Sequence, residues 1–369
     1  MAYDEPTMPP VPPKPLPPPA PSLPVAPPPQ QASIRTSAST PPPTAAPPQA
    51  SRTRVNTRIL LALGIGFLAV AIGVAALGWS LYVRRSDGFA GADLSGLSVS
   101  VSTRDVPENN LLGYMFVVAY ESAGAKVESQ VGAGSAASVR RKMMADRIDA
   151  SVEYNGLAWS RSLSDEDPPT DPAEFTKQAG ALDRDQNGIV WLGRSTFNNA
   201  YGFAVGPQLA EEQGPFTLDS MVSYLRGHPD ASVCLQPKNT LSAAGMGRFE
   251  ELTGFSIPSN QLQQADSATI GPDTADGTCA FSEFAATSGA IVNFNLTLVE
   301  SDDQLEISNA SATVREALYE QRPQAFDTIA TAILEPLDDR TMATLNARVA
   351  NGEDPAAVAK DYLSGQGLM

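Results

Sequence analysis

One segment of the sequence, Ile59–Val83, restricts most strongly what the chain can fold into, because it carries no charged residue. A helix rises about 1.5 Å per residue, so a helix over this segment is long enough to cross a bilayer core of about 30 Å. Arginines flank the segment on both sides, and Trp79 and Tyr82 are typical of an interfacial aromatic anchor. We therefore predict a transmembrane helix over residues 58–84. A cleaved signal peptide is disfavoured, because its apolar region would be shorter and would not follow a long tail.

The residues before this segment are dominated by proline. The chain contains 32 prolines, and most of them precede residue 49, in runs such as PPVPPKPLPPPAPSLP. Proline without apolar periodicity favours extended polyproline II over packing. We therefore expect residues 1–57 to form a disordered, proline-rich tail that acts as a spacer. A PxxP ligand around Lys14, for the groove of a partner protein, is the alternative.

The two cysteines decide the expected topology, because charge bias orients the apolar helix only weakly. Cys234 and Cys279 both follow the helix. An even pair in an acidic domain fits a disulfide formed in an oxidising compartment, and two buried free thiols are the alternative. We therefore expect a single-pass protein of the cell membrane, with the N-terminus in the cytoplasm and the C-terminal domain outside.

After a linker over residues 85–96, the chain is expected to form a soluble unit large enough for two lobes. Strand-like stretches (LSVSVSTRD, IDASVEY, GIVWLG, YGFAVG) alternate with helix-like ones (NNLLGYMFVVAYESAG, ASVRRKMMADR, FTLDSMVSYLRG). This alternation favours an α/β fold with largely parallel sheets. From Ala312 to the C-terminus we predict helix, with breaks at Pro323, Pro336 and Gly352.

Motifs for metal binding or catalysis are weak. The stretch DRDQNG, Asp183–Gly188, matches the first half of an EF-hand loop, but Arg194 stands where a bidentate glutamate belongs, so a polar turn is the preferred interpretation. The single histidine, His228, has no second histidine or cysteine cluster for a zinc site or a triad. We therefore expect no metal, no cofactor and no enzymatic activity. A net charge of −16 argues against nucleic acid as a partner.

Five stretches occur in an order that is typical of one family. They are STRDVPENNLLGYMFVVAYESAGAKVE, VRRKMMADRIDASVEYNG, NGIVWLGRSTFNNAYGFAV, FSEFAATSGAIVNFNLTLVESDD, and VREALYEQRP with LDDRTMATLNARVANGEDPAAVAKDYL. The second ends in an acidic-Tyr-x-Gly turn, and the third carries Val-Trp-Leu followed by Phe-Asn-Asn-x-Tyr. With these stretches, the chain from about residue 97 to its end resembles the substrate-binding proteins of ABC importers for glycine betaine, choline and related osmoprotectants.

The resemblance implies a bilobal α/β fold of the periplasmic-binding-protein type II, with two mixed sheets, flanking helices and two crossover strands. Residues 97–199 and 305–369 would form the first lobe, and residues 200–304 the second. The resemblance also implies a small solute as ligand, with ABC permease and ATPase subunits as partners in trans.

Ligands of this family usually carry a quaternary ammonium, which aromatic faces hold by cation–π attraction. The resemblance places Tyr154 and Tyr201 in that cage, and it places Asn198 and Asn199 where the chain crosses between lobes. A turn is the alternative interpretation of the asparagines, and a core aromatic is the alternative for Tyr201. The further ligand-binding candidates in the matching region are Arg104, Asn109, Gln236 and Phe284.

Several cage positions depart from the family's pattern. Ala285 and Ser308 stand where tyrosines are usual, with Phe284 next to the first of them, and Leu157 replaces a threonine. Gln236 aligns with the arginine that commonly binds a betaine carboxylate. Loss of a charge-assisted hydrogen bond costs about 1.5–3 kcal/mol, and each aromatic face contributes about 0.5–2 kcal/mol. We therefore expect glycine betaine itself to bind weakly or not at all.

Two functions follow from these observations. The first is a membrane-anchored, extracytoplasmic solute-binding protein of an ABC importer for an osmoprotectant or another small cationic or zwitterionic solute. The alternative is a ligand-free, degenerate domain that acts as an interaction module of the cell envelope, with the proline-rich tail binding a partner.

Overall fold

The structure is a computed structural model that describes residues 89, 91–164, 166–236, 243–301 and 305–369. The predicted proline-rich tail, the predicted transmembrane helix and residues 85–88 and 90 of the predicted linker lie outside these residues. In the described ranges, no helix is both long and apolar enough to cross a membrane.

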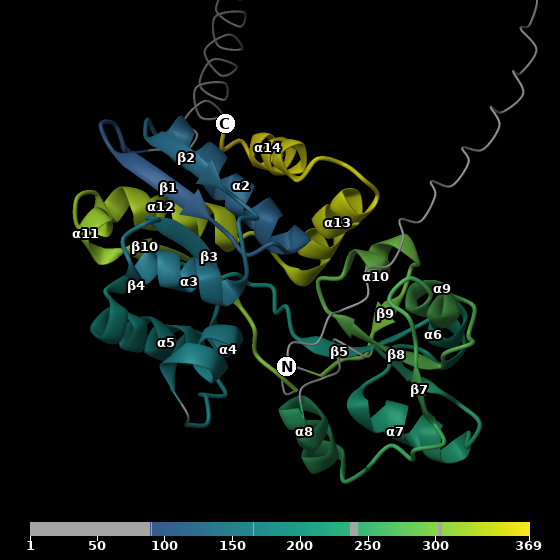
Figure 1. Cartoon of the computed structure of the whole chain (residues 1–369). Coiled ribbons are helices and arrows are strands. Elements are labelled where there is room, and N and C mark those ends of the chain that lie inside the picture. Colours follow the sequence, from purple (N-terminus) through teal and green to yellow (C-terminus); the bar gives the residue numbers. More distant parts are fainter. Residues whose placement is uncertain (1–88, 90, 165, 237–242, 302–304) are drawn as a thin grey trace, which may run out of the picture. The chain divides into compact units, whose positions relative to one another are not determined.

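The first sheet has five strands in the order β2-β1-β3-β10-β4 (Figure 1). β1 runs parallel to β2 and β3, whereas β10 is antiparallel to both β3 and β4. The strands are β1 (Ser98–Ser102), β2 (Lys126–Gln130), β3 (Ala150–Tyr154), β4 (Ile189–Leu192) and β10 (Ala310–Arg315). The sheet is therefore mixed, and we call the part of the chain built on it the first lobe.

Helices cover both faces of the first sheet, and β4 shows why. Val190 and Leu192 belong to a large core with α2, α12, α13 and α14, while Ile189 packs with α3 on the other face. Successive strand residues point to opposite faces, so a continuous apolar strand needs cover on both sides. The helices are α2 (Pro107–Ser122), α3 (Ala136–Met144), α4 (Asn155–Ala158), the π-helical turn η1 (Trp159–Leu163), α5 (Pro172–Asn187), α11 (Glu316–Tyr319), α12 (Pro323–Leu334), α13 (Asp339–Ala350) and α14 (Pro355–Gly365).

Residues 310–315 form strand β10, so the prediction that helix begins at Ala312 is wrong. The sequence of the strand is ASATVR, and its first five residues are buried between β3 and β4. Small and β-branched side chains suit a strand that is covered on both faces. Helix begins only at Glu316, and the breaks predicted near Pro323, Pro336 and Gly352 agree with the ends of α11 to α14.

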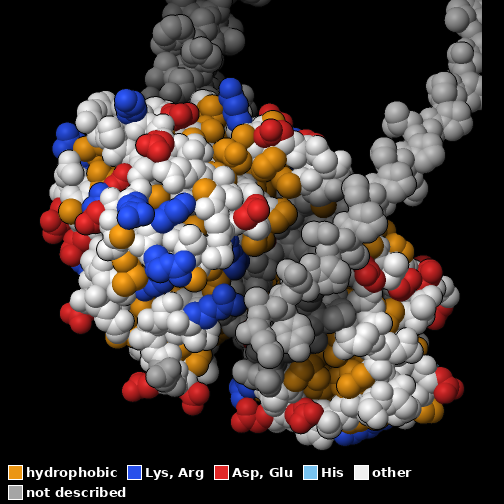
Figure 2. Space-filling view, viewed as in Figure 1, with side chains coloured by type: hydrophobic (Ala, Val, Ile, Leu, Met, Phe, Trp, Pro, Cys, Tyr) orange, Lys and Arg blue, Asp and Glu red, His pale blue; other side chains and the backbone are white. Residues whose placement is uncertain are grey.

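The stretch Asp183–Gly188 also differs from its prediction, because residues 183–187 form the last turn of α5 rather than a polar turn. Gly188 ends the helix with a φ of 64°, which glycine adopts without strain. The Asp183 carboxylate is fully buried and accepts hydrogen bonds from Arg140, Asn187 and Trp191. Arg140 belongs to α3. Figure 2 shows several Lys and Arg side chains on the surface at α3. Both carboxylate oxygens of Asp183 are therefore occupied by hydrogen-bond donors of the protein.

The second sheet has the strand order β7-β6-β8-β5-β9, and we call the part built on it the second lobe (Figure 1). β6 is parallel to β7 and β8, whereas β5 is antiparallel to β8 and β9. The strands are β5 (Tyr201–Val205), β6 (Val233–Leu235), β7 (Leu262–Gln264), β8 (Phe281–Ala285) and β9 (Thr297–Leu298), and the helices are α6 (Pro207–Gln213), α7 (Leu218–Gly227), α8 (Ala243–Thr253), α9 (Ile270–Ala275) and α10 (Gly289–Asn293).

The core of the second lobe also lies on both faces of its sheet. Phe203 and Val205 pack with α7 and α8, whereas Ala204 packs with α9 and the cystine. Cys234 in β6 and Cys279 before β8 form a disulfide with their Cα atoms 5.8 Å apart, which confirms the predicted pair. Closing a loop with a sequence separation of 45 stabilises the fold by about 4 kcal/mol on the chain-entropy account.

Two connecting segments run between the sheets, the first from β4 to β5 and the second from β9 to β10, and Asn198 joins them. Its side chain accepts a hydrogen bond from the Ser308 backbone at 2.6 Å and donates one to the Glu306 carbonyl at 2.9 Å. The expected bilobal fold with two mixed sheets is therefore present. The lobe limits given by the sequence, residues 199 and 305, stay predictions.

Candidate solute-binding site

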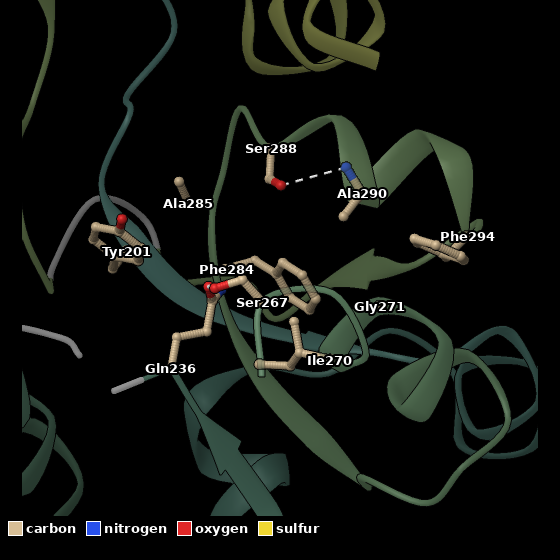
Figure 3. A pocket seen from close by; sticks show the side chains of 10 residues that line it. All are labelled: Tyr201, Gln236, Ser267, Ile270, Gly271, Phe284, Ala285, Ser288, Ala290 and Phe294. Carbon is tan, nitrogen blue, oxygen red and sulfur yellow. Dashed lines mark hydrogen bonds between the residues drawn. The ribbon is translucent and has the colours of Figure 1, made fainter. Parts of the chain in front are cut away.

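A cavity of about 190 Å³ lies on the second lobe (Figure 3). Three predicted ligand-binding residues line it: Tyr201, Gln236 and Phe284. The other lining residues are Ser267, Ile270, Gly271, Ala285, Ser288, Ala290 and Phe294. Pockets for drug-sized ligands occupy about 300–1,000 Å³, so a cavity of this size suits a smaller molecule.

The described residues of the cavity wall are neutral and mix apolar with polar groups. Phe284 comes from β8, and Gln236 directly follows β6. The side-chain oxygen Oε1 of Gln236 accepts a hydrogen bond from the Ser267 hydroxyl at 2.9 Å. The backbone N–H of Gln236 donates to the Glu283 carboxylate at 3.1 Å. No lysine, arginine or carboxylate is among the residues that line the cavity in the described part of the chain. These lining residues therefore offer hydrogen bonds and an aromatic surface without a formal charge of their own.

Tyr201 is half-buried at the start of β5, directly opposite Ala285 in β8. Burial raises the pKa of the Tyr201 hydroxyl; the negative charge of Glu283 adds to this rise and the positive charge of Arg104 opposes it. The hydroxyl therefore stays protonated at neutral pH and keeps its hydrogen for an acceptor. Because Ala285 stands opposite, no second aromatic ring faces Tyr201 across this pair of strands.

A second group of predicted residues surrounds Glu108, which lies in the first turn of α2 and is only 6% exposed. One carboxylate oxygen accepts hydrogen bonds from the Tyr154 hydroxyl at 2.5 Å and from Asn199 Nδ2 at 2.7 Å. The other oxygen accepts from Thr287 Oγ1 at 2.6 Å and from Asn346 Nδ2 at 2.7 Å. Glu108 therefore collects donors from both lobes and from the first connecting segment.

Tyr154 is only 1% exposed, and the guanidinium of Arg104 lies over its ring. The Arg104 Cζ atom lies 5.1 Å from the ring centre, at the distance of a cation–π contact. Arg104 Nε donates to Asn109 Oδ1 at 2.6 Å, while Asn109 Nδ2 is buried with no hydrogen-bond partner among the described residues. Burial raises the pKa of Tyr154 well above its usual value, and the neighbouring Glu108 adds to this rise.

The predicted residues thus fall into two groups, and membership of a ligand site stays a prediction for both. Tyr154 and Asn199 bind Glu108, Arg104 lies over Tyr154 and binds Asn109, and Tyr201, Gln236 and Phe284 line the cavity. Asn198 binds backbone groups of the second connecting segment. The sequence interpretation missed Glu108, Thr287, Asn346 and Ser267.

A signal for Glu108 was present, since it is an acidic residue in the first turn of a helix whose middle part is apolar. An acid at that position usually interacts with the helix dipole, so the pattern alone did not distinguish it. Among the residues that the structure describes, no group of three His, Cys, Asp or Glu side chains is arranged to hold a metal ion.

Comparison with known proteins relates the whole two-lobed region to one family. Residues 98–365 match the OpuAC family, described as the substrate binding domain of ABC-type glycine betaine transport system. The chain is 26% identical over 283 residues to a glycine-betaine-binding protein of Pseudomonas aeruginosa, covering 74% of this chain and 90% of that protein. It is 27% identical over 277 residues to the glycine betaine-binding protein YehZ of Escherichia coli, covering 73% and 90%.

Solved structures share the fold. The structure of apo YehZ from Escherichia coli is 22% identical and superposes with a TM-score of 0.64, covering 74% of this chain and 99% of that one. A structure described as a glycine betaine/carnitine/choline ABC transporter gives a TM-score of 0.65 at 18% identity, covering 73% and 99%.

Proposed function

Since the chain belongs to the family of substrate-binding domains of ABC-type glycine betaine transport systems, we propose that it is the solute-binding component of an ABC importer, anchored to the membrane and facing outward. The family match over residues 98–365 is the observation that carries this proposal. Domains of this family bind solutes and are not enzymes, as the sequence led us to expect. Permease and ATPase subunits are then supplied by other chains.

The proposed ligand is a small polar solute of the cationic or zwitterionic osmoprotectant class. Tyr201 and Phe284 support it, because their aromatic surfaces border the cavity and attract an ammonium group that has no hydrogen to donate. The relatives from Pseudomonas aeruginosa and Escherichia coli are named for glycine betaine, and this favours a chemically similar ligand.

Glycine betaine itself is proposed to bind weakly. Gln236 can donate a hydrogen bond to a carboxylate but cannot neutralise its charge, and Ala285 and Ser308 offer no aromatic face. In addition, Arg104 already covers the ring of Tyr154. A ligand ammonium would have to displace this guanidinium to reach that ring.

Calorimetry on the full-length chain tests the proposal, with glycine betaine, choline, carnitine, proline betaine and free amino acids as ligands. We expect at least one quaternary ammonium compound to bind. Tyr201→Ala should weaken it by about 0.5–2 kcal/mol, or about 2- to 30-fold, because an aromatic face is lost. Tyr201→Phe, which keeps the ring, should bind nearly as well as the wild type, and Tyr319→Ala on α11 serves as a control.

Two results would count against this account. Submicromolar binding of glycine betaine would show that the assignments of Gln236, Ala285 and Ser308 are wrong. No binding of any compound, with Tyr201→Ala leaving every partner interaction of the full-length chain intact, would favour the ligand-free envelope module. That second function is supported by the same contact of Arg104 with Tyr154, which fills an aromatic face that a ligand would need.

A further inference from the structure

The two lobes meet along a seam formed by α13 of the first lobe and the segment Thr287–Asn293 of the second. At one end, Asn293 and Asn351 exchange two side-chain hydrogen bonds of 3.2 and 3.1 Å. In the middle, a Cβ atom placed on Gly289 would lie 2.7 Å from the backbone of Ala347, so only glycine allows this approach. The seam therefore brings backbone close to backbone.

The other end of the seam is the Glu108 carboxylate. Asn346 Nδ2 donates both to Glu108 and to the Thr287 carbonyl, the latter at 2.8 Å, while the Thr287 hydroxyl donates to Glu108. Thr287 of the second lobe is thus held by two side chains of the first lobe. The opposite oxygen of the same carboxylate holds Tyr154 and Asn199, two residues predicted for the ligand site.

The four hydrogen bonds to Glu108 depend on one another, because the Glu108 carboxylate is buried. Removing a charged group from water is costly unless hydrogen-bond donors replace the lost water. No Lys or Arg side chain forms an ion pair with Glu108 within the described ranges, so four neutral donors perform this task. A lobe movement that withdraws Thr287 leaves one carboxylate oxygen short of a donor. It also disturbs the group that orients Tyr154 and Asn199.

We propose that Glu108 is a positioning residue that couples the relative orientation of the lobes to the arrangement of the ligand site. This inference rests on the proposed solute-binding function and adds a residue to it. Glu108 acts through its four partners: Tyr154 and Asn199 on the side of the site, and Thr287 and Asn346 on the side of the seam.

Three variants separate this role from a merely structural one. Glu108→Gln keeps the shape but replaces one acceptor oxygen with an N–H donor, which then faces donors. Thr287→Val removes only the hydroxyl that bridges the lobes and keeps the side-chain volume. Glu121→Gln, an exposed carboxylate in the last turn of the same helix α2, is the matched control.

The lobe orientation is measured as a distance distribution between spin labels on the full-length chain. Asp185→Cys on α5 and Ser223→Cys on α7 provide exposed attachment sites, one on each lobe, and the native cysteines stay paired. The same proteins are titrated with glycine betaine and choline as probes. We expect Glu108→Gln and Thr287→Val to broaden or shift the distribution. Glu108→Gln should also weaken the better probe about tenfold, with Glu121→Gln unchanged in both respects.

The possible results decide the proposal and the function separately. Distances in Thr287→Val that equal those of Glu121→Gln overturn the coupling, even if affinity falls in Glu108→Gln. If Glu108→Gln does not fold, the distances in Thr287→Val still decide. If neither probe nor any other compound binds the wild type, the proposed function fails, while the distances continue to support or refute the coupling.

Discussion

Glu153 shows how the position of a single residue in a sheet sets its acidity. It lies in β3, next to the predicted ligand residue Tyr154. Burial raises the pKa of the Glu153 carboxyl to about 7, and the positive charges of Arg140 and Arg104 only partly oppose this rise. Its folded-state pKa is therefore above the usual value of 4.5, so the folded state holds the proton more tightly than the unfolded state does.

The raised pKa of Glu153 makes the folded state less stable as the pH rises. The stabilising effect of the Glu153 proton is complete below about pH 4.5 and is lost as the pH rises through about 7. We expect the free energy of unfolding of the wild type to fall by about 1–3 kcal/mol between pH 5 and 8, relative to Glu153→Gln. Urea unfolding at both pH values measures this difference. Equal pH dependence in the two proteins would contradict it, and Glu121→Gln controls for the loss of a negative charge.

The two cage tyrosines illustrate what the sequence can and cannot predict about a site. The motifs around Tyr154 and Tyr201 placed both in one ligand cage. In the structure, Tyr154 is buried under Arg104, while Tyr201 borders a cavity. The motif identifies a position in the chain, but exposure depends on side chains that arrive from distant segments. Glu108 was not predicted as a site residue for the same reason, because its partners Thr287 and Asn346 are far away in the sequence.

At the scale of elements, the packing of α10 on α13 is sensitive to the addition of a single methyl group. A Cβ atom on Gly289 would lie 2.7 Å from Ala347 backbone atoms, and backbone cannot move aside as a flexible side chain does. We expect Gly289→Ala to lower the free energy of unfolding by about 1–3 kcal/mol through overpacking. Denaturant unfolding with unchanged slope measures this loss.

The matched control is Gly247→Ala inside α8, where no atom of the described residues lies within 4 Å of the added methyl group. There the substitution should stabilise the protein by about 0.5–1 kcal/mol, because alanine favours helix over glycine. Effects of the same sign and size at Gly289 and Gly247 would show that close packing of α10 on α13 does not contribute to stability.

Elements with a clear period or a clear stop were predictable, and elements defined by distant partners were not. The apolar spacing of α2 and the prolines that begin α12 and α14 mark helices without reference to the rest of the fold. β10 lacks such independence, because its apolar residues run on into the helical stretch at Glu316 and its strand partners lie in β3 and β4. β2 is mostly polar and exposed, so it shows no alternation that would identify a strand.

At the scale of the whole molecule, the order of the segments explains why two lobes form. The chain builds most of the first sheet, crosses to complete the second, and returns so that β10 fills the position between β3 and β4. The last strand of the first sheet, β10, therefore follows all strands of the second sheet in the sequence. Asn198, together with the Asn199 backbone N–H that donates to the Ser308 carbonyl at 2.9 Å, holds the outgoing and returning segments together. Two of the predicted ligand residues, Asn198 and Asn199, thus lie where the outgoing and returning segments are joined.

We expect this two-lobed domain to lie outside the membrane and residues 1–57 to lie in the cytoplasm. The Cys234–Cys279 disulfide requires an oxidising compartment, a solute receptor must face the solute, and the uncharged segment Ile59–Val83 can tether it. Protease is added to cells whose outer layers admit large proteins but whose membrane is sealed, and tags at both ends are followed by blotting. The C-terminal tag should disappear while the N-terminal tag survives, and detergent should expose both. Loss of the N-terminal tag alone would refute the topology and, with it, the receptor role.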